Sequence, residues 1–329
     1  MKAGVFASSL RDTRIDVAGA LELARGNGCS ACMFGSAFEL SPKLDLGELA
    51  DRRAQAADCG IALHVAFPQL HPHRIGQDRD LLAAGDGDVL LGARRLLEAS
   101  ATLDGRDLTV IIGRIEDRFD PVVPWADQLA AAGALLDRMA PMLRDTGLRF
   151  ALKTHEEITS FEVVRLAERL GQDVAGIAFD PVNVLVNLED PAAAATRVAG
   201  WTTQVMVEDA ELDHAGDRVR RLLCPLDEGV VDWAAIARIL AALAPAPPQH
   251  WIELHRGQFS VYPYDARWLA HHPDLDVVEY AAALRMVLDS TERITSARRA
   301  GLEAAQARPT TRLAKAVAFL PFLSQEDRS

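Results

Sequence analysis

The stretch that decides the fold is residues 150–180, FALKTHEEITSFEVVRLAERLGQDVAGIAFD. It opens with a short apolar run at 150–153 and closes with another at 176–180, both of the length and composition of buried strands. Between them, residues 161–170 have the apolar spacing of a helix, and Thr159 and Ser160 ahead of Glu162 are a helix-start signal. The stretch therefore predicts a strand–helix–strand unit, the building block of a parallel sheet.

The same alternation continues in both directions along the chain. Eight strands are predicted, at residues 4–7, 31–34, 61–64, 108–112, 150–153, 176–180, 204–207 and 251–254. Helical patterns separate them, for example at residues 126–143 and at residues 233–243 after the capping residue Asp232. Eight such units over about 250 residues predict an α/β fold, the (β/α)8 TIM barrel. An open doubly wound sheet is disfavoured, because no glycine-rich phosphate loop follows the first strand.

The pattern changes after residue 257. We assign residues 1–257 to the barrel and residues 258–329 to a C-terminal helical extension, with helices at 275–288 and 291–307 and a last helical segment at 311–323. The extension is expected to pack on the barrel or on a second copy of the chain, which would make the protein a homodimer.

Composition excludes several classes of protein. The chain has 329 residues and a formal net charge of -12, which argues against a nucleic-acid partner because phosphate binding needs a basic surface. The apolar run at 316–323 is too short to span a bilayer, so no membrane association is expected. Four cysteines form no disulfide framework and no signal peptide is recognised, so we expect a cytoplasmic protein.

Polar residues at the strand ends are the candidates for function, because the carboxyl ends of barrel strands surround the active site. Here they are His64, Arg114, Lys153, His155, Asp180, Asn183, Glu208, Asp209, Glu253 and His255. Alternation along a strand places Lys153 and His155 on one side. Burying so many ionisable groups singly would be unfavourable, so they predict a shared, solvated cavity.

Five motifs resemble, in order and spacing, those of the xylose isomerase-like family of sugar isomerases and epimerases. They are Ala151-Leu152-Lys153-Thr154-His155 followed by Thr159-Ser160, then Phe179-Asp180 ahead of Asn183, residues 205–210, residues 225–233, and Trp251-Ile252-Glu253-Leu254. The resemblance covers residues 1–257. It implies a TIM barrel enzyme that acts on a small carbohydrate-like substrate.

The resemblance also implies a divalent metal, Mn²⁺ or Mg²⁺, held by two glutamates, an aspartate and a histidine. Asp180 and Glu253 match the aspartate and one glutamate, whereas Lys153 stands at the other glutamate and Met206 at the histidine. An ammonium repels a cation, and a thioether is a poor ligand for hard metals. We therefore expect no cofactor, and at most weak binding of Mn²⁺ or Mg²⁺ by Asp180 and Glu253.

Lys153 has three interpretations, which the sequence leaves open. It could replace the charge of the metal between Asp180 and Glu253 and stabilise an enolate. It could form a Schiff base with a ketone if its pKa were lowered. It could also be a structural ion pair in a barrel without catalysis. In the first case Glu253 is the expected general base, with acid or base partners among His155, His255 and His64.

Substrate binding is assigned to four further residues, His64, Arg114, Asn183 and Glu208. Arg114 is expected to bind a substrate carboxylate or phosphate, or else to pair with Glu116 or Asp117. Glu208 replaces a lysine of the family and is expected to pair with Lys153. The basic run after the seventh strand contains Arg218, Arg220 and Arg221. One of them could reach the pocket, but a solvated face is the favoured interpretation.

Together these features predict a sugar isomerase or epimerase that acts at the carbon next to a carbonyl, without the metal of the family. One alternative is a lyase, either a dehydratase or a decarboxylase, acting on a keto sugar acid. Another is a sugar-binding barrel without catalysis.

Overall fold

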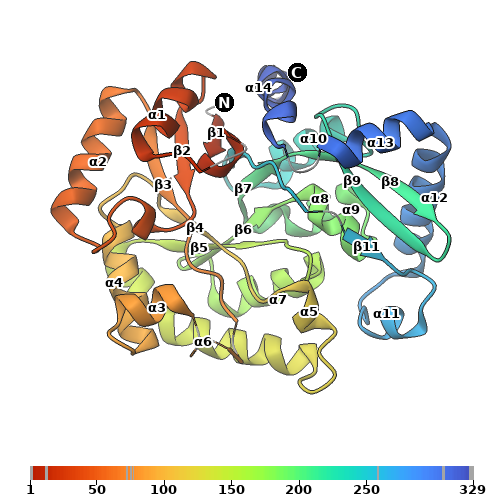
Figure 1. Cartoon of the computed structure of the whole chain (residues 1–329). Coiled ribbons are helices and arrows are strands. Elements are labelled where there is room, and N and C mark those ends of the chain that lie inside the picture. The colour runs from red at the N-terminus through yellow and green to blue at the C-terminus, as the bar shows by residue number, and fades with distance from the viewer. Residues whose placement is uncertain are drawn as a thin grey trace.

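Eight parallel strands form one sheet that curves into a nearly closed barrel (Figure 1). The computed structural model describes residues 3–11, 14–71, 73, 74, 76, 78–257, 259–305 and 308–325. The barrel strands are β1 (Ala3–Phe6), β2 (Ala31–Phe34), β3 (Ala62–Val65), β4 (Asp107–Val110), β5 (Arg149–Lys153), β6 (Ala175–Phe179), β7 (Thr202–Val207) and β10 (Gln249–Ile252). Their order is β3-β2-β1-β10-β7-β6-β5-β4. Each overlaps a predicted strand, so the prediction of a (β/α)8 barrel is confirmed.

The barrel closes between β3 and β4, where the two strands form no regular ladder. Beyond the end of β3, Phe67 N donates a hydrogen bond to Thr109 O at 2.9 Å, and Leu70 N donates to Ile111 O at 2.8 Å. These bonds lie just past the strand ends, at the side of the barrel where the loops form the mouth. The seam therefore depends on loop residues as well as strands.

Side chains fill the interior of the barrel. The interior cluster contains Phe6, Met33, Ala151, Ala178, Met206 and Trp251. The Trp251 ring lies so close to Gly4 that a Cβ at Gly4 would come within 2.2 Å of it, so the ring needs a glycine there. Met206, at the position of the family histidine, is wholly buried in this cluster.

Helices cover the outside of the barrel. They are α1 (Val17–Gly26), α2 (Leu46–Asp58), α3 (Arg79–Ala84), α4 (Val89–Ser100), α5 (Ile115–Arg118), α6 (Trp125–Thr146), α7 (Ser160–Leu170), α8 (Pro181–Val184), α9 (Pro191–Val198) and α10 (Trp233–Leu243), with 3₁₀ helices η1 (Ala7–Ser9), η2 (Ala37–Glu39), η4 (Leu185–Asn187) and η5 (Ala199–Trp201). Helix α7 begins with the predicted capping box: Thr159 accepts from Glu162 N, and Glu162 accepts from Thr159 N.

A second, antiparallel sheet lies beside the barrel and was not predicted. It consists of β8 (Asp209–Ala215), β9 (Arg218–Cys224) and β11 (Phe259–Val261) in the order β11-β9-β8. Strands β8 and β9 form a hairpin with Gly216 at its turn, where φ is 72°. In Figure 1 the hairpin lies on the side of the barrel away from α1 and α2.

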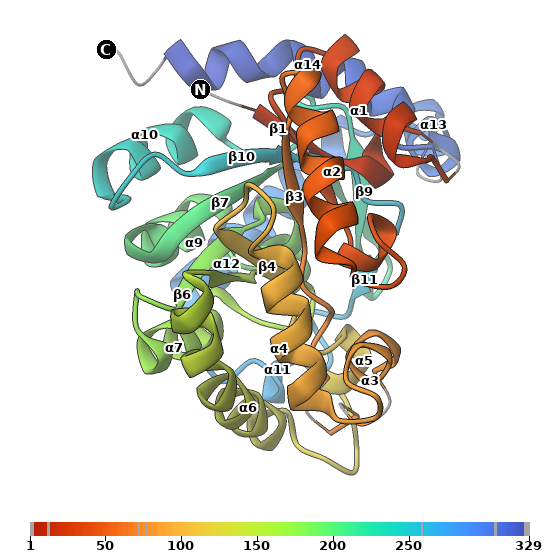
Figure 2. The same ribbon diagram turned by 90° about the vertical axis from the view of Figure 1, so that its left-hand side faces the viewer.

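The C-terminal helices pack on this hairpin and on the barrel. They are α11 (Ala266–Ala270), α12 (Val277–Arg293), α13 (Ser296–Ala305) and α14 (Thr310–Gln325), and they include the three predicted helical segments. Helix α12 contacts β8, and α13 contacts β9. Helix α14 contacts α10 and β10, and lies between α10 and α1 in the outer layer (Figure 2). Within the described residues, we find no helix with the length and apolarity that a membrane crossing requires.

Candidate active site

The Lys153 side chain lies at the centre of the candidate site. It ends strand β5, and only 1 % of it is exposed. Its Nζ is 2.8 Å from Glu253 Oε2, 3.1 Å from Asp180 Oδ2 and 3.3 Å from His255 Nε2. An ammonium has three N–H donors; the two carboxylates take up two of them, and the third could bond to His255 only when Nε2 carries no proton. The two acids that the sequence assigned to Lys153 are therefore its partners.

Asp180 is held in place by further hydrogen bonds besides its contact with Lys153. It follows β6 and caps the short helix α8, where its carboxylate accepts from Val182 N at 3.2 Å. Asn183 Nδ2 donates to Asp180 Oδ2 at 2.8 Å, and Arg221 Nη1 donates to Asn183 Oδ1 at 2.6 Å. Asn183 is wholly buried and uses its amide to orient Asp180. In this structure it presents no exposed surface to a substrate, contrary to its predicted role.

His255 is bound by Glu208. Glu208 Oε1 accepts from His255 N at 2.8 Å, and Oε2 lies 2.5 Å from His255 Nδ1. Glu208 also pairs with Arg312, which comes from α14. The expected pair between Glu208 and Lys153 is wrong: the carboxylate turns to His255 and Arg312 instead. As a result His255 presents Nε2, its other ring nitrogen, to Lys153.

His155 belongs to a separate group of ionisable residues on the loop after β5. Its Nε2 lies 2.7 Å from Glu156 Oε2, and its Nδ1 lies 2.5 Å from Glu157 Oε2. Burial alone would lower the pKa of His155, but the charges of Glu157 and Glu156 outweigh it and raise the pKa to about 10. His155 is therefore an imidazolium at neutral pH. The sequence analysis expected His155 to act as a general acid or base near neutral pH. Its raised pKa does not suit that role.

The charges at the centre are fixed in the same way. Burial would lower the pKa of Lys153, but Glu253 and Asp180 more than compensate and raise it above its ordinary value. Burial would raise the pKa of Glu253, yet Lys153 and His255 keep it below its ordinary value. At neutral pH the arrangement is thus an ammonium between carboxylates. A Schiff base needs the neutral amine, so this environment opposes that role of Lys153.

Solvent reaches only part of this group. The side chain of Glu253 is 18 % exposed and that of His255 is 15 % exposed, whereas Lys153 and Asp180 are buried. Glu253 Oε1 lies 3.7 Å from His255 Nε2, so a carboxylate and an imidazole nitrogen of two partly exposed side chains are neighbours. A base beside a proton donor is the combination that proton transfer at carbon requires.

Two of the predicted substrate-binding residues lie elsewhere. The His64 ring packs edge-on against Trp251 in the barrel interior, with ring centroids 4.9 Å apart, and burial lowers its pKa to about 4. It shares no contact with the Lys153 group among the described residues. Arg114 begins α5 with an exposed side chain, and the described residues include no ion pair for it, so the expected pairing with Glu116 or Asp117 is wrong.

Two arginines lie beside the site: Arg221, for which a solvated face was the favoured interpretation, and Arg312, which the sequence analysis did not consider. Arg221 on β9 is 2 % exposed and binds Asn183, and its guanidinium lies 4.8 Å from the centre of the Phe259 ring. Its interpretation as part of a solvated face is wrong. The sequence did carry a signal for its burial: Val219, Arg221 and Leu223 occupy every second position, and such residues lie on one face of a strand. Arg312 gave no comparable signal, because its partner lies about a hundred residues away.

A divalent metal does not fit the residues at this point. Asp180, Glu253 and His255 bring one ligand atom each within 4.8 Å of one another, as a metal site would. The Lys153 ammonium, however, lies within 3.3 Å of the Asp180 carboxylate, the Glu253 carboxylate and the His255 imidazole. A metal ion there would meet a positive charge that these carboxylates keep protonated.

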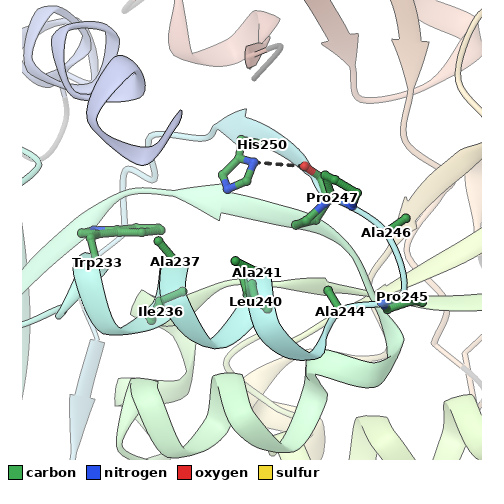
Figure 3. A pocket seen from close by; sticks show the side chains of 11 residues that line it. Trp233, Ile236, Ala237, Leu240, Ala241, Ala244, Pro245, Ala246, Pro247 and His250 are labelled. Carbon is green, nitrogen blue, oxygen red and sulfur yellow. Dashed lines mark hydrogen bonds between the residues drawn. The ribbon is translucent and has the colours of Figure 1, made fainter. Parts of the chain in front are cut away.

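Cavities lie at both ends of the barrel. One of about 390 Å³ opens at the mouth beyond β1 and β2, with Phe6 and Met33 in its lining and Arg14, Glu39 and Arg256 around them. Another, of about 550 Å³, lies between α10 and the loop that leads into β10 (Figure 3). Figure 3 shows it lined by alanines, prolines and apolar side chains, with His250 as its ionisable residue. It lies at the amino-terminal end of β10, away from the Lys153 group.

Comparisons with known proteins agree with this architecture. A family model described as "Xylose isomerase-like TIM barrel" matches residues 21–258. The uncharacterized protein YihM of Escherichia coli strain K12 is 25 % identical over 223 residues, which are 65 % of this chain and 68 % of that protein.

Solved structures are similar over most of their length. A structure of L-ribulose 3-epimerase matches 100 % of this chain and 96 % of its own, with a TM-score of 0.61 and 17 % identity. A structure from Bacillus anthracis, described as the probable 3-DHS dehydratase AsbF, matches 83 % of this chain and 98 % of its own, with a TM-score of 0.58 and 13 % identity. At such identities the likeness shows a shared fold.

Proposed function

Because the chain belongs to the xylose isomerase-like TIM barrel family, we propose that it is an enzyme that moves a proton at the carbon next to a carbonyl. Its substrate is a small polyhydroxylated ketone or aldehyde, and its reaction is an isomerisation or epimerisation. The observation that carries the proposal is the Lys153 ammonium, 2.8 Å from Glu253 and 3.1 Å from Asp180. It places a positive charge beside a carboxylate base.

In the proposed reaction, the Glu253 carboxylate takes the proton from the carbon next to the carbonyl. The C–H electron pair forms the enediolate, and His255 donates a proton to its oxygen, which gives an enediol. Transfer of the first proton from Glu253 to the neighbouring carbon, while the other hydroxyl returns a proton to His255, gives an isomer. Protonation of the original carbon on its opposite face by a second donor, while the same hydroxyl returns its proton to His255, gives an epimer. Lys153 is buried between two carboxylates, so it acts through its charge, which stabilises the enediolate and keeps Glu253 ionised.

The proposed reaction uses no divalent metal. In the metal-containing arrangement that the resemblance implies, three carboxylates and one divalent ion sum to one negative charge. Asp180, Glu253 and Lys153 also sum to one negative charge, so the ammonium keeps the charge balance of the site. A single ammonium is a weaker stabiliser of an enediolate than a divalent ion. We therefore expect a slow enzyme or a substrate whose proton is already acidic.

Two other candidates remain. A lyase would begin with the same proton removal and then expel a hydroxyl from the adjacent carbon. A sugar-binding barrel without catalysis is favoured by one observation, the 1 % exposure of Lys153. Both are separated from the proposal by the same measurement.

That measurement is proton exchange in D₂O. Ketoses, aldoses and keto sugar acids are incubated with EDTA-treated enzyme, and NMR follows deuterium entering the carbon next to the carbonyl. We expect exchange that persists without metal and falls about 100-fold or more in Glu253→Gln, the usual loss on removing a general base. Glu116→Gln, which changes an exposed carboxylate on α5, is the matched control.

The outcomes are distinct. A ligand that binds without exchange would make the protein a binding barrel, and release of water from the substrate would make it a lyase. Undiminished exchange in Glu253→Gln would remove Glu253 as the base. Borohydride treatment during turnover tests the Schiff base, since a reduced adduct on Lys153 in the mass spectrum would contradict the electrostatic role.

A further inference from the structure

Helix α14 delivers a buried arginine to the candidate site. Arg312 is 2 % exposed, although it belongs to the last helix of the chain. Its Nη1 donates to the Glu208 carboxylate, and its Nη2 donates to the His255 backbone carbonyl. One guanidinium thus binds both the partner of His255 and the backbone of His255 itself. The planar fork of arginine allows this double contact, which a lysine could not reproduce in full.

The contact continues to the reacting groups. Glu208 fixes His255 by accepting from its backbone N–H at 2.8 Å and lying 2.5 Å from Nδ1. This leaves Nε2 pointing to Lys153 at 3.3 Å, to Glu253 at 3.7 Å and to Asp180 at 3.8 Å. The orientation of the ring therefore depends on Glu208 being ionised and correctly placed.

Glu208 needs a partner that fixes its position. Its side chain is 1 % exposed, and a buried carboxylate is stabilised by ion pairs and hydrogen bonds with good geometry. Arg312 supplies this second contact beside His255. Without it the carboxylate would be less fixed, and the His255 ring would be free to turn.

Apolar packing holds α14 at this point. Leu313 and Ala316 are buried on the face of α14 that also carries Arg312, and α14 contacts α10 and β10. The helix lies outside residues 21–258, the part that matches the family model. The contact therefore comes from a part of the chain that the family model does not cover.

We propose that Arg312 is a positioning residue of the candidate site. Through Glu208 it fixes the orientation and the proton of His255, so the site is complete only when α14 is docked on the barrel. The effect on turnover rests on the function proposed above, whereas the effect on His255 does not.

The charged groups that face His255 come from the carboxyl ends of β5, β6, β7 and β10 and from α14. They are Lys153 at the end of β5 and Glu156 after it, Asp180 after β6, Glu208 after β7, Glu253 after β10, and Arg312 on α14. Among them Arg312 opposes protonation of His255, and Glu208 favours it. Removing Arg312 leaves the Glu208 charge unopposed and should raise the pKa of His255. Removing the Glu208 charge should lower it.

The test is an NMR titration of the imidazole of His255 in the full chain, with the signal assigned by its loss in His255→Gln. We expect the titration midpoint to move up in Arg312→Ala and down in Glu208→Gln, each by about half a pH unit or more. Arg312→Lys should restore most of the midpoint. Lys315→Ala, on the same helix and paired with Glu228 at 3.2 Å, is the matched control and should leave it unchanged.

Kinetics give the second readout once a substrate is known. Arg312→Ala should lower kcat by about 10- to 100-fold with little change in KM, as loss of a group that orients a ligand or base usually does. A wild-type titration midpoint in folded Arg312→Ala, verified by circular dichroism, would overturn the proposal. If Arg312→Ala does not fold, Arg312→Gln takes its place, because it keeps most of the side chain and removes the charge; a wild-type midpoint in folded Arg312→Gln would overturn the proposal. Altered midpoints in a protein without proton exchange would instead contradict the proposed function alone.

Discussion

At the scale of single residues, the site is a set of charges that neutralise one another. The Lys153 ammonium lies between Glu253 and Asp180, and the His155 imidazolium lies between Glu156 and Glu157. In each case burial opposes the positive charge and the two carboxylates restore it. Changing one member should therefore affect its partners, and two predictions follow this rule.

The first prediction concerns metal binding. Lys153→Glu replaces the ammonium with the carboxylate that the family places there, and it joins Asp180, Glu253 and His255. We expect the variant to bind Mn²⁺ at least about 100-fold more tightly than wild type, because charge and ligand number both change in favour of the ion. Isothermal titration calorimetry measures it.

Lys153→Met separates the two effects in this experiment. It removes the positive charge and adds no oxygen ligand, so its affinity for Mn²⁺ should lie between those of wild type and Lys153→Glu. Tight binding of Mn²⁺ by the wild-type protein would contradict the role that we propose for Lys153.

The second prediction concerns stability and pH. The pKa of His155 is raised from 6.5 to about 10, so its protonation stabilises the fold fully below pH 6.5 and progressively less up to pH 10. His155→Gln should lower the free energy of unfolding by a few kcal/mol, on the order of 3, near pH 6. The difference from wild type should shrink as pH approaches 10, which urea titrations at several pH values can follow.

His73→Gln is the control, because this exposed histidine lies in the loop after β3. It should leave the pH dependence unchanged. A difference between wild type and His155→Gln that stays constant from pH 6 to pH 10 would show that the raised pKa does not operate.

At the scale of elements, the β8–β9 hairpin links the outer helices to the site. Its inward residue Arg221 reaches Asn183 at 2.6 Å and Glu156 at 3.4 Å. Asn183 then orients Asp180. The hairpin is thus more than a surface connection between β7 and α10. It supplies one of the charges that keep the carboxylates of the site in place.

We expect Arg221→Met to lower the free energy of unfolding by roughly 3 kcal/mol, because it leaves the buried amide oxygen of Asn183 without its partner and takes one of two positive partners from the buried Glu156 carboxylate. Arg218→Met changes an exposed arginine of the same strand and should stay within about 0.5 kcal/mol of wild type. Thermal or urea unfolding measures both. Equal effects of the two substitutions would mean that the Arg221 contacts contribute nothing.

At the scale of the whole molecule, the C-terminal region is joined to the barrel by polar contacts as well as apolar ones. The outer edge of β8 donates from Leu212 N to Ser290 Oγ at 3.0 Å and from His214 N to Thr291 Oγ1 at 2.8 Å, so α12 covers this edge. Arg299 and Asp213 add an ion pair between α13 and the hairpin. Arg312 joins α14 to Glu208.

These contacts predict that residues 258–329 do not unfold as a separate unit. Urea unfolding followed by tryptophan fluorescence and by circular dichroism should give coincident transitions. Hydrogen exchange should protect the amides of Leu212 and His214 about as well as those of the barrel strands. An early transition in which α12 and α13 lose protection while the barrel keeps it would contradict this view.

Much of this fold could be predicted from local patterns. Short apolar runs and capping residues such as Thr159 and Asp232 depend on neighbours within a few residues, and the structure has all eight predicted strands. The β8–β9 hairpin was missed because its charged residues resemble a solvated run when they are read without a period of two. For the candidate site, strand ends identified Lys153, Asp180, Glu253 and His255 as a group.

The sequence by itself determined the barrel and the family, and it placed Lys153 at a strand end with acids at the ends of other strands, because each depends on residue type and short-range order. Only the tertiary structure decided which charged side chains form pairs with one another. Glu208 lies beside His255 and Arg312 rather than Lys153, and His64 lies against Trp251. Such pairs join residues far apart in the chain, and their choice depends on the distances and burial that the packed barrel imposes.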